Sequence, residues 1–276
     1  MSFKSILVHV EADTATEPRL KLAAALANDF DARLVGVAAE LFEAPVAASV
    51  AGYVDGETMM AEARVVEDDL RQAEARFMAA ARDVRAGSDW RCAVAMPADM
   101  LALHARAADL VVAGPHRKEP YAFHNRADPG DLVMLSGRPV LVAPLELTRL
   151  DASSVVVGWK DTREARRAMA DAMPFLERAT QVLVAEVCEN RDEAACKDRL
   201  ADVASLLAAH GVKASVRAVP FSGAPAAESL QQIADAQNAG LIVVGAYGHA
   251  RVREWVFGGV TRALLAGGHR AVLFSH

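Results

Sequence analysis

Short runs of Val, Ile and Leu alternate along the chain with longer, Ala-rich stretches in which apolar residues recur at helical spacing. The runs 6–10 and 155–159, for example, precede the amphipathic stretches 17–27 and 162–179. Strands that are apolar throughout belong in sheets covered by helices on both faces, and strand–helix alternation requires right-handed βαβ crossovers. The pattern therefore predicts an α/β protein with parallel sheets.

The same pattern occurs twice. Each copy has a first apolar run, a helix-like stretch opened near a proline, a run that ends on glycine, and a last apolar run, and the matched segments are 6–10 and 155–159, 97–105 and 225–234, 108–114 and 239–245, and 138–142 and 270–274. Four landmarks in one order indicate a duplication. We therefore predict two tandem, doubly wound parallel-sheet domains, over residues 1–146 and 153–276.

Composition supports this division and limits the partners. A length of 276 residues suits two domains of ordinary size. The formal net charge is −6, and acidic and basic residues are interspersed along the chain, so we expect no nucleic acid and no membrane as partner. The start of the chain has no signal-peptide pattern, no apolar segment is long enough to cross a bilayer, and the cysteines form no CxxC pair, so we expect a cytoplasmic protein.

The first copy carries an additional stretch, residues 41–58, for which two interpretations remain open, a mobile loop or a lid over that copy's cleft. Single residues of chemical interest have plain interpretations. We expect His9, inside a strand run, to be a packed core residue, and each of Cys92, Cys188 and Cys196 to be an ordinary core or surface residue.

A glycine-rich loop follows the run 239–245 and leads into a predicted helix near 259–265. In open α/β sheets ligands bind at the carboxyl ends of the strands. Glycines let the backbone approach a phosphate, and the N–H groups of a helix start favour an anion. The candidate ligand-binding residues are Gly245, Gly248, His249, Arg251, Gly258, Gly259, Val260, Thr261 and Lys160.

The spacing Gly-x2-Gly-x9-Gly between strand and helix, with the Gly-Val-Thr that follows and the duplicated context, resembles the universal stress protein A family over essentially the whole chain, once per copy. The resemblance implies about five strands and about four helices per copy, in the adenine nucleotide alpha hydrolase-like fold. It also implies a bound ATP, or ADP or AMP, with its adenine near the first two strands. In that arrangement Gly245, Gly248 and Gly258 hold the ribose and phosphates, and Gly259, Val260 and Thr261 offer backbone N–H groups and a hydroxyl. Pairing through the last strands, 140–142 and 272–274, is implied as well, within the chain as a pseudo-dimer or between chains as a homodimer.

The chain departs from the family pattern in both copies. In the second copy Gly259 replaces the usual Ser or Thr, and Lys160 replaces the usual Asp. The first copy has Arg117 in place of the second glycine, and Asp128 and Pro129 where the helix begins. We therefore expect no nucleotide in the standard pose in the first copy. Its basic residues Arg117, Lys118 and Arg126 are either solvated surface charges or contacts for a different anion.

These observations predict a cytoplasmic stress-response protein that binds adenine nucleotide in its second copy and acts as a ligand-dependent regulator or interaction module. Two alternatives remain, a nucleotide-free scaffold and a slow ATPase or autophosphorylating enzyme that uses Mg²⁺. The sequence has no P-loop, dinucleotide, zincin or hydrolase motif and no identifiable general base, so no catalytic residue is assigned.

Overall fold

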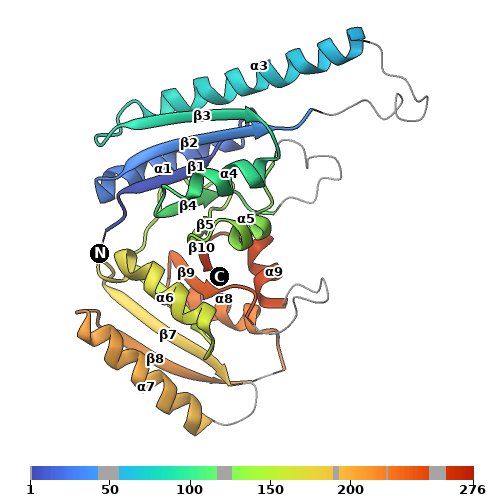
Figure 1. The fold of residues 1–276 in the computed structure, drawn as a ribbon. Helices are drawn as coiled ribbons and strands as arrows, with labels where there is room; N and C mark the ends of the chain where they lie inside the picture. Colours follow the sequence, from blue (N-terminus) through green and yellow to red (C-terminus); the bar gives the residue numbers. More distant parts are fainter. Residues whose placement is uncertain (1, 43–55, 117–125, 189–192, 222, 249–258) are drawn as a thin grey trace.

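The computed structural model describes residues 2–42, 56–116, 126–188, 193–221, 223–248 and 259–276. They form a single ten-stranded sheet with helices on both faces, in the order β3-β2-β1-β4-β5-β10-β9-β6-β7-β8 (Figure 1). The two ends of this order belong to different copies, and the last strands of the two copies meet in the middle.

Each copy contributes five strands and four helices within the described residues. The first copy consists of β1 (Ser5–His9), α1 (Thr16–Phe30), β2 (Arg33–Glu40), α3 (Gly56–Ala81), β3 (Ser88–Val94), α4 (Pro97–Ala105), β4 (Leu110–Ala113), α5 (Pro129–Leu135) and β5 (Val140–Val142). The second consists of β6 (Ser154–Trp159), α6 (Arg163–Leu176), β7 (Gln181–Cys188), α7 (Glu193–Ala209), β8 (Ala214–Pro220), α8 (Ala226–Ala236), β9 (Leu241–Gly245), α9 (Gly259–Leu265) and β10 (Ala271–Ser275).

Within each copy all strand pairs are parallel, and the chain reverses its direction of winding between β1 and β4 and between β6 and β9. The helices before the reversal, α1, α3, α6 and α7, pack on one face. Those after it, α4, α5, α8 and α9, pack on the other. The prediction of a doubly wound α/β fold in tandem is confirmed, and two topological switch points result, one in each copy.

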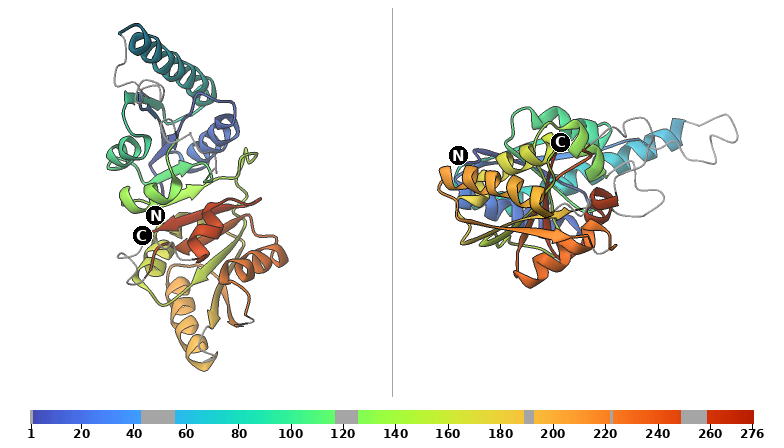
Figure 2. Two further views of the ribbon diagram at one scale, coloured as in Figure 1. Left: turned by 90° about the vertical axis from the view of Figure 1, so that its right-hand side faces the viewer. Right: turned by 90° about the horizontal axis from the view of Figure 1, so that it is seen from below.

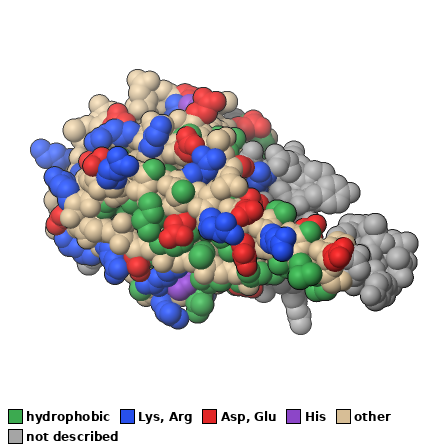
Figure 3. All heavy atoms as spheres, turned by 90° about the horizontal axis from the view of Figure 1, so that it is seen from above, with side chains coloured by type: hydrophobic (Ala, Val, Ile, Leu, Met, Phe, Trp, Pro, Cys, Tyr) green, Lys and Arg blue, Asp and Glu red, His purple; other side chains and the backbone are tan. Residues whose placement is uncertain are grey.

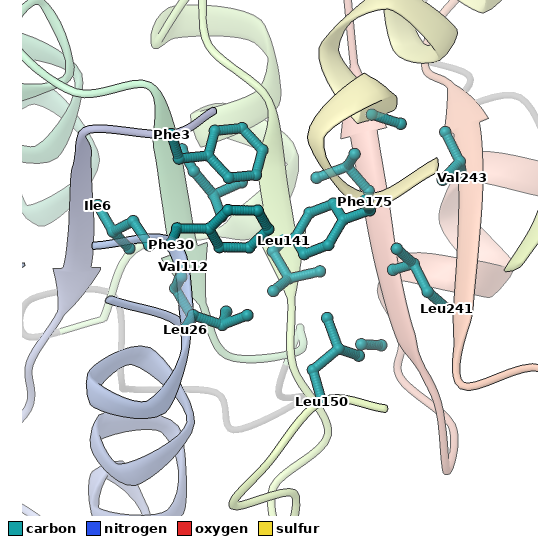
Figure 4. Packing of buried hydrophobic residues seen from close by; sticks show 14 of the residues in the cluster. Phe3, Ile6, Leu26, Phe30, Val112, Leu141, Leu150, Phe175, Leu241 and Val243 are labelled. Atoms are coloured by element: carbon teal, nitrogen blue, oxygen red, sulfur yellow. The ribbon is translucent and has the colours of Figure 1, made fainter. Parts of the chain in front are cut away.

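The junction of the two copies is the only antiparallel pair of strands in the described sheet. Val142 lies opposite Val272, Leu141 opposite Leu273 and Val140 opposite Phe274. A second contact between the copies lies on one face of the sheet. There Phe3 and Phe30 of the first copy pack around Phe175 of α6, with ring centroids 5.0–5.3 Å apart (Figure 4). The hydrophobic core on that face is therefore continuous across both copies.

Helix α3 reaches beyond the body of the first copy (Figure 2). Its buried residues, Val66, Ala73, Phe77 and Ala81, begin only at the third turn, while Met59 and Met60 near its start are exposed. Of the additional stretch 41–58, the last three residues form the beginning of α3, and residues 43–55 lie outside the described residues.

Candidate functional site

The candidate site of the second copy lies at the switch point between β6 and β9. These strands are parallel neighbours, so the residues that follow them, Lys160 and the glycine loop, meet at one edge of the sheet. Thr162 caps α6 at this edge, and its hydroxyl accepts a hydrogen bond from the Ala165 N–H at 3.3 Å. The start of α6 therefore faces the glycine loop.

Gly245 is needed for packing against that helix. A Cβ on Gly245 would lie 2.5 Å from the backbone nitrogen of Ala165 and 2.5 Å from the carbonyl carbon of Glu164. Both atoms belong to the backbone of α6 and cannot move aside as a side chain can. The space beside Gly245 is thus filled by protein, and its contact with a ligand stays a prediction.

Gly248 has a different neighbour, the carboxylate of Glu164. A Cβ on Gly248 would lie 3.0 Å from Glu164 Oε2 and 3.4 Å from Thr162 Oγ1. Glu164 is buried and forms an ion pair with Arg163, whose own side chain is largely exposed. A negative charge therefore occupies the space beside the glycine that the sequence assigns to ribose and phosphate.

Two opposing influences act on Glu164. Burial by itself raises the pKa of its carboxyl, but hydrogen bonds with Arg163, its own backbone and Thr162, together with the Arg163 charge, bring the pKa below its ordinary value. The group is consequently ionised at neutral pH. A phosphate that enters this space has to displace the carboxylate.

The other predicted site residues are only partly brought together. Lys160 is exposed at the end of β6, Gly259 is exposed at the start of α9, and Val260 is half-buried. Thr261 is buried within α9. His249, Arg251 and Gly258 lie outside the described residues, as does Trp255.

Tyr247 connects the loop to the first copy. Its φ of 58° lies in the left-handed region, which is uncommon for a residue with a side chain. Its hydroxyl lies beside Gly130 at the start of α5, where a glycine Cβ would meet it at 2.6 Å. Burial, and then the carboxylates of Asp128 and Asp131, raise the pKa of this hydroxyl to about 12. The glycine loop of the second copy thus contacts α5, the helix of the first copy that corresponds to α9.

The switch point of the first copy is filled by charged side chains. Arg19 is buried, donates from Nε to the His9 carbonyl at 2.9 Å and lies 3.4 Å from Glu11 Oε1. Its guanidinium also occupies the space beside Gly114, the counterpart of Gly245. Arg126 pairs with Asp13 at 3.0 Å. Arg126 is therefore part of an internal ion-pair cluster and not a solvated surface charge.

The helix start of the first copy is occupied as well. Asp128 caps α5, and its Oδ1 accepts hydrogen bonds from the Gly130 N–H at 2.7 Å and the Asp131 N–H at 3.3 Å. The second carboxylate oxygen, Oδ2, lies 2.5 Å from Nδ1 of His116. The N–H groups that would meet a phosphate are thus taken by the chain's own carboxylate.

The sequence analysis did not predict the roles of Glu164 and Arg19 at the two switch points, nor the contact of Tyr247 with the start of α5. A signal existed for Glu164, because an acidic residue two positions after a capping threonine lies in the first turn of a helix, beside the switch point. Arg19 and Tyr247 gave no such signal. Their positions depend on contacts with residues far away in sequence.

Within the part of the chain that the structure describes, no group of three or more His, Cys, Asp and Glu residues could hold a metal ion. No helix among the described residues has the length and apolar character needed to cross a membrane. On the face shown in Figure 3, basic and acidic side chains are intermixed over the described residues.

Comparison with known proteins gives a family match for the second half of the chain and a shared fold for the whole chain. Residues 170–276 match the universal stress protein family model. A universal stress protein from Archaeoglobus fulgidus DSM 4304 is similar over 98% of this chain and 95% of its own, at a TM-score of 0.68 and 14% identity. A functionally unknown protein from Pseudomonas aeruginosa PAO1 is similar over 99% of this chain and 92% of its own, at a TM-score of 0.55 and 14% identity. No curated protein matches the chain.

The second half of the chain thus matches the universal stress protein family model, and the whole chain shares its fold with the solved structures to which it is similar.

Proposed function

We propose that the second copy binds an adenine nucleotide, with ATP as the first candidate and ADP or AMP as alternatives. Binding would make the protein a ligand-dependent regulator or interaction module of a cytoplasmic stress response. The observation that supports this most is the coincidence of two features. The family match covers 170–276, and within it the glycine loop leaves β9 at the topological switch point.

A nucleotide beside Gly248 would require the side chains at the start of α6 to move. Near Gly248 the atoms that would obstruct a ligand belong to the side chains of Glu164 and Thr162, which can change rotamer. Among the described residues, no heavy atom lies within 4 Å of the position that a Cβ on Gly259 would take. Gly259 and Val260 would offer N–H groups to the phosphates, Lys160 would add positive charge, and Mg²⁺ would partly neutralise a triphosphate.

Titration calorimetry of the full chain with ATP and Mg²⁺ tests the proposal, and we expect about one site per chain. Gly248→Val and Gly258→Val should abolish the heat of binding. Gly56→Val is a matched control, because a Cβ at Gly56 meets no atom of the described residues within 4 Å and this residue lies at the start of α3 in the other copy. Unchanged binding in both loop variants would refute the assignment.

A second candidate function, a nucleotide-free scaffold, is favoured by Glu164, whose carboxylate lies beside Gly248. To test this candidate, the protein is purified without added nucleotide and denatured, and any nucleotide that it releases is measured. Release of ATP, ADP or AMP in a ratio near one per chain would exclude the scaffold, and its absence together with a silent titration would favour it.

Catalysis is a third candidate, as slow ATP hydrolysis or autophosphorylation. Turnover has to exceed the background rate and has to be lost in Gly248→Val to count as activity of this site. We further propose that the β5–β10 pairing gives the chain an internal pseudo-dimer, which a homodimer of whole chains would extend. Light scattering of the purified protein measures the number of chains.

A further inference from the structure

Two of the three cysteines lie together at the carboxyl end of β7. Cys188 is the last residue of this strand and Cys196 lies in the first turn of α7. Both side chains are buried, and the two thiols hydrogen-bond to each other. Cys188 also donates to the Glu186 carbonyl with a separation of 3.7 Å. The two thiols are therefore direct neighbours, at the end of β7 and in the first turn of α7.

Arg199 links this buried pair to solvent. Its guanidinium lies 3.2 Å from Cys196 Sγ and 2.5 Å from Glu186 Oε1, while 36% of its side chain is exposed. A neighbouring guanidinium stabilises a thiolate. Burial acts in the opposite direction and raises the pKa of the Cys196 thiol to about 12. The nucleophilic form of Cys196 is therefore scarce at neutral pH, and its reactions should be slow.

The third cysteine cannot take part in the same molecule. Cys92 lies in β3, at one end of the sheet, while β7 is next to the other end. Eight strand spacings separate the two strands in the sheet order, which corresponds to about 38 Å. An intramolecular disulfide in this chain can therefore join only Cys188 and Cys196.

We propose that Cys188 and Cys196 form a reversible disulfide when the protein meets a hydroperoxide. The Cys196 thiolate attacks one peroxide oxygen, the O–O bond breaks, and a sulfenic acid forms with release of one water from hydrogen peroxide. The Cys188 thiol then attacks the Cys196 sulfur, the S–O bond breaks and a second water leaves. Two thiols lose two electrons and one peroxide is reduced to two waters.

The bond would tie the end of β7 to the first turn of α7, and a dithiol reductant would reopen it. The inference does not depend on nucleotide binding. It makes the second copy responsive to an oxidant through residues that lie away from Gly248 and Gly259.

The test uses the full chain with hydrogen peroxide, followed by denaturation, thiol titration and mass spectrometry without reductant. We expect one thiol of three to remain, a chain lighter by the mass of two hydrogen atoms, and a Cys188–Cys196 crosslinked peptide that dithiothreitol removes. Three remaining thiols, or oxidation confined to Cys92, would overturn the proposal.

Cys92→Ser should retain the mass loss, whereas Cys188→Ser and, where serine impairs folding, Cys188→Ala should lose it. The rate of crosslinking in Cys92→Ser should rise about tenfold per pH unit as the thiolate fraction grows. A rate independent of pH contradicts attack by the buried Cys196 thiolate. Equal mass loss in the Cys188 variants contradicts the pairing.

Discussion

At the residue scale, Glu164 is the side chain that most affects the space beside the glycine loop of the second copy. Its carboxylate lies beside Gly248, where a phosphate is expected, and the hydrogen bonds from Arg163 and Thr162 keep it ionised. Two negative charges at about 4 Å repel by about 1 kcal/mol even in water and by more in a cleft. On the proposed function, a nucleotide would therefore bind against the cost of moving this group or sharing its space.

Glu164→Gln removes the charge and keeps the shape, so it should tighten ATP binding about tenfold, or roughly 1.4 kcal/mol. Calorimetry of both proteins at the same Mg²⁺ concentration measures the difference. Glu228→Gln, an exposed residue in the first turn of α8, is the matched control and should leave the affinity unchanged. Equal affinity in the two variants would show that Glu164 does not oppose the ligand.

His9 is buried, as its place in a strand run predicts, and burial lowers its pKa from 6.5 to about 4. As pH falls from 6.5 to about 4, the unfolded chain takes up a proton that the folded chain does not. The protein should therefore lose up to about 3 kcal/mol of unfolding free energy in this window. Urea titrations across this pH window should show a smaller loss of unfolding free energy for His9→Gln than for the parent protein. His210→Gln, at an exposed position, should show the same loss as the parent. If the unfolding free energy of His9→Gln fell with pH as steeply as that of the parent protein, groups other than His9 would cause the loss.

At the scale of elements, the site depends on how closely the start of α6 approaches the end of β9. The added methyl group of Gly245→Ala would lie 2.5 Å from α6 backbone atoms and should cost about 2 to 3 kcal/mol. Chemical denaturation measures this cost. Gly259→Ala, where the methyl group meets no atom within 4 Å in the part of the chain that the structure describes, should change stability by less than about 1 kcal/mol. Similar losses in both variants would contradict the close approach.

The element scale also shows where sequence prediction was adequate. The helices at 97–105 and 259–265 begin and end where the sequence predicts, because proline at a first turn and glycine-bounded apolar runs are local signals. The assignment of Gly245 to a ligand followed from the same local reasoning. Only the packing of α6 reveals the backbone contact beside this glycine, because residues about 80 positions away in sequence provide it.

At the scale of the whole molecule, the two copies share one sheet and one core, so we expect them to unfold in a single transition. Phe175→Ala removes one of three rings at the junction and should cost about 3 to 4 kcal/mol. Fluorescence and circular dichroism during denaturation should coincide for the parent and separate for the variant. Phe221→Ala, at an exposed position, should neither lower the stability by this amount nor separate the two signals. A parent protein with two separate transitions would contradict this coupling.

The sequence by itself determined the α/β class, the duplication and the edge of the sheet where a ligand would bind, because periodicity and glycine spacing are local properties. The tertiary structure alone decided which groups fill that edge. Glu164 lies beside Gly248, Arg19 beside Gly114, and Cys188 against Cys196. Each of these contacts joins residues from different elements, and only the packing of helices on the sheet brings such residues within a few ångströms.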